Sequence, residues 1–148
     1  MSKQISIALL GTALTALLLS SESGHGHSID SAHSFGEPVR RARPSVLYLT
    51  HSAGFKHDVL PLSQQILKQI GERTNAFETT ATEDCSLQSR EGLKKYDAVV
   101  FYTTGELPIS DEQKTAFLDF IKSGKGFIGI HSATDTFYKW PEYGDLIG

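Results

Sequence analysis

Histidine and carboxylate side chains stand directly after short apolar runs of this sequence. His51 and His57 flank a glycine-containing loop with Asp58 beside them, and His131 follows the apolar run 126–130. Imidazole accepts and donates protons near neutral pH, and it also binds divalent metals. The pattern therefore predicts general acid–base catalysis by His131, His57 and His51, or a metal site built from the same three residues.

Each histidine also has a purely structural interpretation. One of the first pair could bond a backbone group while Asp58 caps the following helix, and His131 could be a hydrogen-bonded core histidine. We favour a catalytic His131, because it directly follows an apolar strand at the position where such sheets present reactive groups. Ser132 would be a nucleophile only if a histidine accepted its proton. We interpret it instead as a small loop residue.

Two carboxylates, Glu106 and Asp135, are expected to bind substrate. Asp135 stands between two threonines. It could hold sugar hydroxyls or a metal through oxygen, or form an Asx turn that fixes its own loop. As a pair, the two carboxyl groups would suit a glycosidase if they lay about 5 to 9.5 Å apart.

Aromatic residues gather beyond the run 126–130, namely Phe137, Tyr138, Trp140 and Tyr143. We expect Trp140 and Tyr143, together with Phe55, to contact substrate, because an aromatic face suits the apolar C–H face of a sugar. Packing in the core is the alternative. Pro141 favours a loop here and hence the binding platform.

Short apolar or β-branched runs alternate with amphipathic segments along residues 45–148. The runs predict strands at 46–50, 77–82, 98–102 and 126–130, the second of them polar enough for an edge position. Alternating strands and helices predict an α/β fold with a parallel sheet and right-handed crossovers. The carboxyl ends of all four strands, and the polar residues after them, then meet at one edge of the sheet.

Three helices are expected between these strands. The first buries one apolar face, formed by Leu62, Ile66, Leu67 and Ile70. A short helix covers 87–95. The third begins at a capping box formed by Ser110 and Gln113, and Gly124 ends it.

Composition excludes several functions. The net charge of −3 over 148 residues provides no basic field for nucleic acid. The single cysteine, Cys85, excludes an intramolecular disulfide and a multi-cysteine zinc site, and two preceding acids disfavour its thiolate. No dinucleotide fingerprint follows the first strand, and Gly124-Lys125-Gly126 is not a phosphate loop. A divalent metal is the one cofactor left open.

The N-terminal region is typical of an exported protein. Residues 1–23 combine Lys3, an apolar stretch and small residues suited to cleavage, which predicts a signal peptide. Residues 24–44 lack large apolar residues and predict a flexible linker. We therefore expect a periplasmic or extracellular protein without a further membrane-spanning domain.

Three segments carry a family likeness. Residues 50–58, 81–84 and 126–135, the last leading into 140–144, resemble motifs of the ThuA-like (trehalose utilisation) family. The resemblance implies a flavodoxin-like, three-layer α/β sandwich similar to class I glutamine amidotransferases. Those enzymes carry a cysteine on a Gly-x-Cys-x-Gly elbow. Here His131 takes its place in the run 129–133, so glutamine amidotransferase activity is not expected.

The resemblance also implies a function in carbohydrate utilisation. We expect an exported domain that binds and processes a disaccharide or keto-sugar, as a hydrolase or lyase. A non-catalytic carbohydrate-binding module and a metal-assisted hydrolase are the alternatives. Because domains of this family continue beyond the 140–144 segment, residues 45–148 are expected to be an N-terminal portion ending after the fourth strand, with marginal stability.

Overall fold

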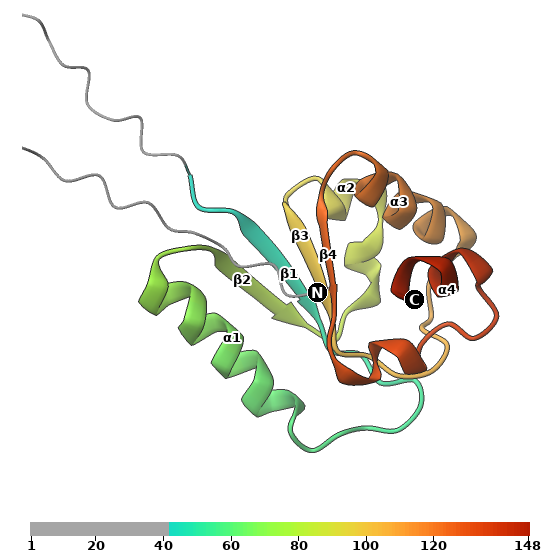
Figure 1. Cartoon of the computed structure of the whole chain (residues 1–148), viewed down its shortest axis with the longest axis horizontal. Helices are drawn as coiled ribbons and strands as arrows, with labels where there is room; N and C mark the ends of the chain where they lie inside the picture. The colour runs from blue at the N-terminus through green and yellow to red at the C-terminus, as the bar shows by residue number, and fades with distance from the viewer. Residues whose placement is uncertain (1–41) are drawn as a thin grey trace, which may run out of the picture. The chain divides into compact units, whose positions relative to one another are not determined.

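The structure, a computed structural model, describes residues 42–148. Four parallel strands form a single sheet in this part of the chain (Figure 1). The strands are β1 (Ser45–Leu49), β2 (Glu78–Thr82), β3 (Ala98–Phe101) and β4 (Gly126–Gly129). Their order, β2-β1-β3-β4, is that of a flavodoxin-like sheet. The predicted α/β fold and parallel sheet are confirmed. The predicted signal peptide and nearly all of the predicted linker lie outside the described residues.

The burial of each strand matches its place in the sheet. β1 and β3 are central and almost fully buried, as their continuous apolar runs predict. β2 is the polar edge strand that the sequence predicts. β4 is the opposite edge and is largely exposed, with Ile128 53% exposed.

Helices lie on both faces of the sheet, which makes three layers (Figure 1). On one face α1 (Leu60–Thr74) packs against β2. The other face carries η1 (Cys85–Gln88), α2 (Arg90–Leu93), α3 (Asp111–Lys122) and α4 (Pro141–Ile147), which share one core with β1 and β3. The short helix η2 (His131–Asp135) directly follows β4. None of these helices is long and apolar enough to cross a membrane.

The main core is aromatic. Phe101 of β3 stacks on Phe117 of α3 with ring centroids 5.1 Å apart, and Trp140 and Tyr143 stack at 5.7 Å. Burial raises the pKa of Tyr143, so its hydroxyl stays protonated, and it donates a 2.7 Å hydrogen bond to the carbonyl oxygen of Ala133. This bond ties α4 to η2.

The third helix starts as predicted. Ser110 and Gln113 form the complete capping box at the N-terminus of α3. Gly124 follows its C-terminus with a φ of +93°, a conformation that glycine adopts without strain.

Two expectations about helices are wrong, one of them only in part. Leu67 of the predicted apolar face packs against the sheet. Leu62, Ile66 and Ile70 are instead 54%, 46% and 45% exposed, because α1 docks on the sheet through a face that contains Leu60 and Gly71. At Gly71 a Cβ atom would lie 2.5 Å from the carbonyl oxygen of Phe77, so the helix approaches the sheet at its smallest residue. Pro141 does not mark a loop. It is the first residue of α4, where proline is well tolerated.

Candidate active site

Backbone hydrogen bonds join three loops at the carboxyl edge of the sheet. The amide of Ala53, after β1, donates to the carbonyl oxygen of Thr104, after β3, at 2.8 Å. The amide of Gly105 donates to the carbonyl oxygen of Asp135, after β4, at 2.7 Å. Isolated bridges pair Ser52 with Thr104 and Gly105 with Thr136. The loops therefore have fixed positions relative to one another.

Gly105 stands at the centre of this network. Its φ is +73°, and a Cβ atom there would lie 2.7 Å from the amide nitrogen of Gly54. Both the backbone conformation and the close approach require glycine.

Threonine hydroxyls and one carboxylate add side-chain links between the same loops. The hydroxyls of Thr103 and Thr136 lie 2.9 Å apart in a buried pair, and the Thr104 hydroxyl donates to the carbonyl oxygen of Phe55 at 2.8 Å. Glu106 accepts a 3.0 Å hydrogen bond from the amide of Lys139. Glu106, expected to bind substrate, is thus engaged in holding the segment that follows η2.

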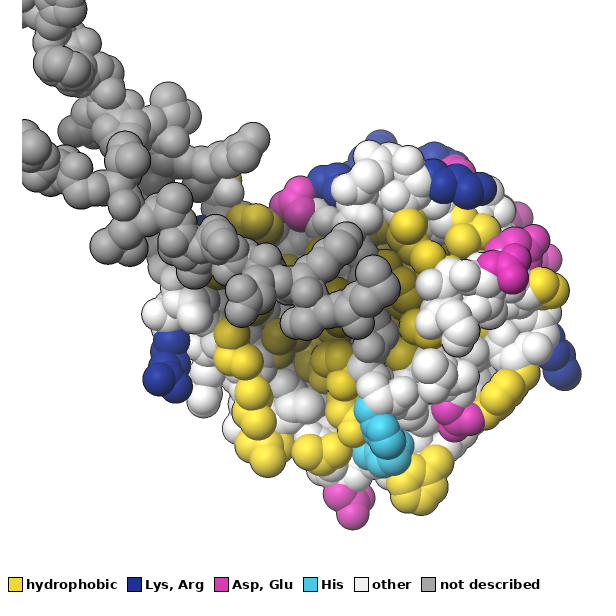
Figure 2. Space-filling view, in the orientation of Figure 1, with side chains coloured by type: hydrophobic (Ala, Val, Ile, Leu, Met, Phe, Trp, Pro, Cys, Tyr) yellow, Lys and Arg dark blue, Asp and Glu magenta, His cyan; other side chains and the backbone are white. Residues whose placement is uncertain are grey.

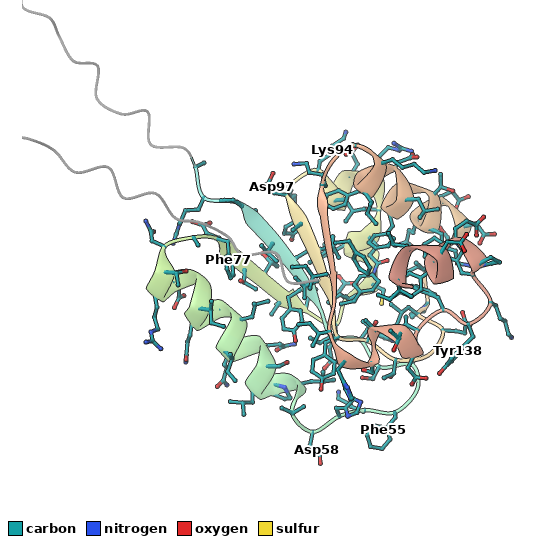
Figure 3. All side chains as sticks on the ribbon, viewed as in Figure 1. Phe55, Asp58, Phe77, Lys94, Asp97 and Tyr138 are labelled. Carbon is teal, nitrogen blue, oxygen red and sulfur yellow. The ribbon has the colours of Figure 1, made fainter. Side chains whose placement is uncertain are left out.

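His57 and His131 lie against each other on this framework. Their ring centroids are 4.9 Å apart in an edge-to-face arrangement. The ring of Tyr102, at the end of β3, lies 5.7 Å from both imidazoles, and Phe55 packs edge-on against His57 at 4.9 Å. Figure 3 shows Phe55 and Asp58 projecting from the loop between β1 and α1, which also carries His57. We call the three residues His57, His131 and Tyr102 the imidazole–phenol cluster.

The backbone of His131 is strained. Its φ is +47°, a left-handed conformation that non-glycine residues seldom adopt. It is the first residue of η2 and lies two residues after the end of β4, so the chain makes a sharp strand-to-helix turn here. In nucleophile elbows the same strand–turn–helix arrangement exposes the reactive side chain at the top of the sheet. The His131 side chain is exposed here, and strain of this kind is concentrated at functional sites.

The imidazole–phenol cluster can move protons. Within residues 42–148 the two imidazoles are held by aromatic contacts and by no hydrogen bond to another described residue, which leaves their ring nitrogens free for a ligand. Two imidazoles and a phenol whose rings contact one another can supply a general base and a general acid.

His51 lies apart from the imidazole–phenol cluster. Its Nδ1 atom is 2.9 Å from the carbonyl oxygen of Glu83, and the ring lines a cavity on the side of β2. Residues 42–148 contain no group of three or more His, Cys, Asp or Glu side chains placed to hold a metal ion. The expected metal site of His51, His57 and His131 is therefore not formed.

The aromatic binding platform is only partly present. Trp140 is 6% and Tyr143 1% exposed, and both belong to the main core, so they are not available to contact substrate as expected. Trp140, just before α4, packs against Phe117, and Tyr143 of α4 packs against Phe137. Phe55, by contrast, is 69% exposed beside His57.

The other residues that the sequence singled out are either exposed to solvent or serve the structure. Asp135 is exposed at the end of η2, with its backbone carbonyl bonded to Gly105. Asp58 does not cap α1, because the N-cap is Val59. Ser132 is 7% exposed, and no described residue bonds its hydroxyl, so no histidine accepts its proton. Burial, reinforced by the charge of Asp84, raises the pKa of Cys85 to about 11, which agrees with the predicted unreactive thiol.

Tyr102 is the residue of the imidazole–phenol cluster that sequence reasoning missed. It is the last residue of an apolar run and was counted with the strand. Its position at the carboxyl end of a central strand is the available signal, because ligands of parallel sheets bind just beyond these strand ends.

Comparison with known proteins points to one family. Residues 45–148 match the family model named ThuA, described as trehalose utilisation. A solved structure of a ThuA-like protein from Bacteroides uniformis superposes with a TM-score of 0.58 at 20% sequence identity, covering 76% of this chain. The present chain spans 46% of that protein, about half its length. No curated protein sequence matches the chain.

Proposed function

Because the chain belongs to the ThuA family, we propose that it processes a sugar or keto-sugar with His57 and His131 as a proton-transfer pair. Membership of this family suggests a role in trehalose utilisation. One observation carries the proposal beyond that role. Two imidazoles lie 4.9 Å apart at the carboxyl edge of the sheet, one of them on strained backbone.

The chemistry that suits the imidazole–phenol cluster is proton abstraction next to a carbonyl group. One imidazole removes the C–H proton, the electron pair of that bond forms a C=C bond, and the π pair of the C=O bond moves onto oxygen, which receives a proton from the other imidazole or from Tyr102. The product is an enediol when the carbon that loses the proton carries a hydroxyl group, as in a keto-sugar. A glycosidase would need two carboxylates beside the reacting bond, whereas this cluster consists of imidazoles and a phenol.

Phe55 gives the substrate a surface to rest on. It is 69% exposed and packs edge-on against His57, so a sugar ring stacked on it would lie beside the catalytic imidazole. Asp135 is exposed and lies four residues after His131 in the chain, and its carboxylate would bind hydroxyl groups of the substrate. Export to the periplasm or the extracellular space belongs to the same proposal and is supported by the signal-like sequence 1–23.

The test is solvent proton exchange. Full-length protein is incubated in D2O with fructose, or with trehalose as the non-keto comparison, and deuterium at carbon is followed by NMR. We expect His131→Ala and His57→Ala each to reduce the exchange rate about 10²- to 10⁴-fold, the usual contribution of a general acid or base. His33→Ala, in the segment predicted to be a linker, is the matched control and should leave the rate unchanged. Exchange at the wild-type rate in His131→Ala would remove this residue from the mechanism.

A further inference from the structure

A cavity with charged and polar side chains in its lining lies at the same edge of the sheet. Its volume is about 640 Å³, and it opens between the loops that follow β1, β2 and β3. It is lined by His51, Glu83, Asp84, Cys85, Ser86, Ser89, Pro108, Ser110 and Gln113. His57, His131 and Tyr102 do not line it, so this cavity is separate from the imidazole–phenol cluster.

His51 has a fixed hydrogen-bonding role in this cavity. Its Nδ1 atom lies 2.9 Å from the carbonyl oxygen of Glu83, and a carbonyl oxygen can only accept. Nδ1 therefore carries the hydrogen of the neutral ring, and Nε2 presents a lone pair. His51 thus offers an acceptor to a ligand hydroxyl.

The cavity also offers a hydroxyl donor. Ser89 and Ser110 accept from the amides of Gly92 and Gln113 at 3.1 and 3.3 Å. The Ser110 hydroxyl donates to the Glu112 carboxylate, whose pKa it lowers, so Ser89 is the hydroxyl that can donate to a ligand. Helix N-termini attract anions through their amides, but the Glu112 carboxylate in the first turn of α3 offsets that attraction here.

The charges around the cavity disfavour an anion further. Glu83 and Asp84 line it, and none of the lining residues is Lys or Arg. Hydrogen bonds from the Ser86 hydroxyl and amide lower the pKa of Asp84, which keeps this carboxylate charged at neutral pH. Lys56 at 3.2 Å pairs with Glu83 and offsets one of the two charges.

We propose that this cavity is a binding site for an uncharged ligand that carries several hydroxyl groups, and that it rejects the phosphorylated form of the same ligand. Hydroxyl groups can donate to His51 Nε2 and to the carboxylates, and they can accept from Ser89. A phosphate group in the same place would face two carboxylates, with no Lys or Arg among the lining residues. The proposal does not depend on the proton-transfer chemistry of His57 and His131.

Binding is measured by calorimetry on the full-length chain, with trehalose and trehalose 6-phosphate as probes. We expect trehalose to bind at least tenfold more tightly than its phosphate ester. Replacing the acceptor in His51→Phe should weaken trehalose binding about tenfold, whereas His51→Gln, which restores an acceptor, should recover part of the loss. Equal or tighter binding of the phosphate ester, or no binding of either probe up to 20 mM (roughly the weakest useful affinity), would overturn the proposal.

A charge variant separates this site from the imidazole–phenol cluster. Glu83→Gln leaves Lys56 unpaired and removes one negative charge, so it should narrow the preference for trehalose over the phosphate ester by about tenfold. Glu91→Gln is the matched control, since Glu91 also pairs with a lysine, Lys94, but lies on α2 outside the cavity. If His131→Ala abolishes trehalose binding while His51→Phe leaves it unchanged, the ligand binds at the imidazole–phenol cluster and the cavity proposal fails. Absence of proton exchange in the wild-type protein, with His51-dependent binding intact, would instead defeat the proposed function alone.

Discussion

Two histidines of one loop differ in what surrounds their rings. His51 is fixed by a backbone carbonyl group, which sets its tautomer and leaves it a hydrogen-bond acceptor. His57 is held by the rings of Phe55, Tyr102 and His131 and keeps both nitrogens free within the described residues. The same side chain therefore suits ligand recognition in one place and proton transfer in the other.

Gly105 is the residue on which the loop network depends most. Gly105→Ala forces a β-carbon into a left-handed backbone and to within 2.7 Å of the Gly54 amide nitrogen. We expect a loss of about 2 kcal/mol or more in the free energy of unfolding, measured by urea denaturation. Gly144→Ala is the control, because a Cβ atom there meets nothing within 4 Å inside α4. It should stabilise the protein slightly. Equal stability of the two variants would contradict the role of Gly105.

Cys85 should resist alkylation in the folded protein. The thiol is 6% exposed, and burial raises its pKa to about 11, so about one thiol in a thousand is ionised at pH 8. We expect iodoacetamide to modify it at least about 100-fold more slowly than in 6 M urea, as followed by mass spectrometry. Rapid modification without urea would show that the loop after β2 opens.

At the scale of elements, Asp97 joins the amino ends of three strands. Its carboxylate accepts a 2.6 Å bond from Lys125, just before β4, and a 2.9 Å bond from the amide of Ser45 in β1, while Asp97 itself precedes β3. These bonds, with Lys125 the larger cause, lower the pKa of Asp97.

The pKa shift gives a pH-dependent contribution to stability. A carboxyl group whose pKa is lowered by folding stabilises the protein above its unfolded pKa of about 3.9, and the contribution is lost as the pH falls below that value. Asp97→Asn should therefore be less stable than wild type at pH 7, by under about 1 kcal/mol for so exposed a pair. The difference should shrink at pH 3 in urea denaturation. Asp145→Asn, exposed on α4, should show no such dependence.

The elements themselves were largely predictable from sequence, whereas their contacts were not. The central strands β1 and β3 are predictable because continuous apolar runs need cover on both faces, and Ser110 with Gln113 is a local signal that no tertiary contact overrides. The predicted face of α1 is wrong at three of its four residues because periodicity finds an apolar stripe but not the partner that covers it. Likewise, the pairing of His57 with His131 depends on loop bonds between residues far apart in sequence.

At the scale of the whole molecule, residues 42–148 leave one face of their sheet partly uncovered. α1 packs against β2, and the same face of β4 carries the exposed Ile128. Figure 2 shows hydrophobic side chains gathered along α1 and over the neighbouring sheet. With Leu62, Ile66 and Ile70 these residues form an apolar surface larger than isolated exposed side chains would give.

This apolar surface should bind hydrophobic dyes. We expect the double variant Ile66→Lys and Ile128→Lys to reduce 1-anilinonaphthalene-8-sulfonate fluorescence severalfold and to lower light scattering at high protein concentration, because charge on an edge strand opposes association. Stability should change by less than about 1 kcal/mol, since both side chains are about half exposed. Tyr138→Lys is the control, because Tyr138 is also exposed but lies in the segment after η2. This variant should leave the dye fluorescence and the light scattering near wild type.

The loop between β1 and α1 has a consequence for how this chain can vary in length. Loops usually tolerate insertions, and at the turn that contains Gly124 a β-carbon would meet nothing within 4 Å. His51 and His57, however, are six positions apart, and the Ala53 amide bonded to Thr104 lies between them. One residue added or removed there would displace a histidine from the cavity or from its partner His131. Natural or engineered length changes should therefore be accepted at Gly124 and rejected between His51 and His57.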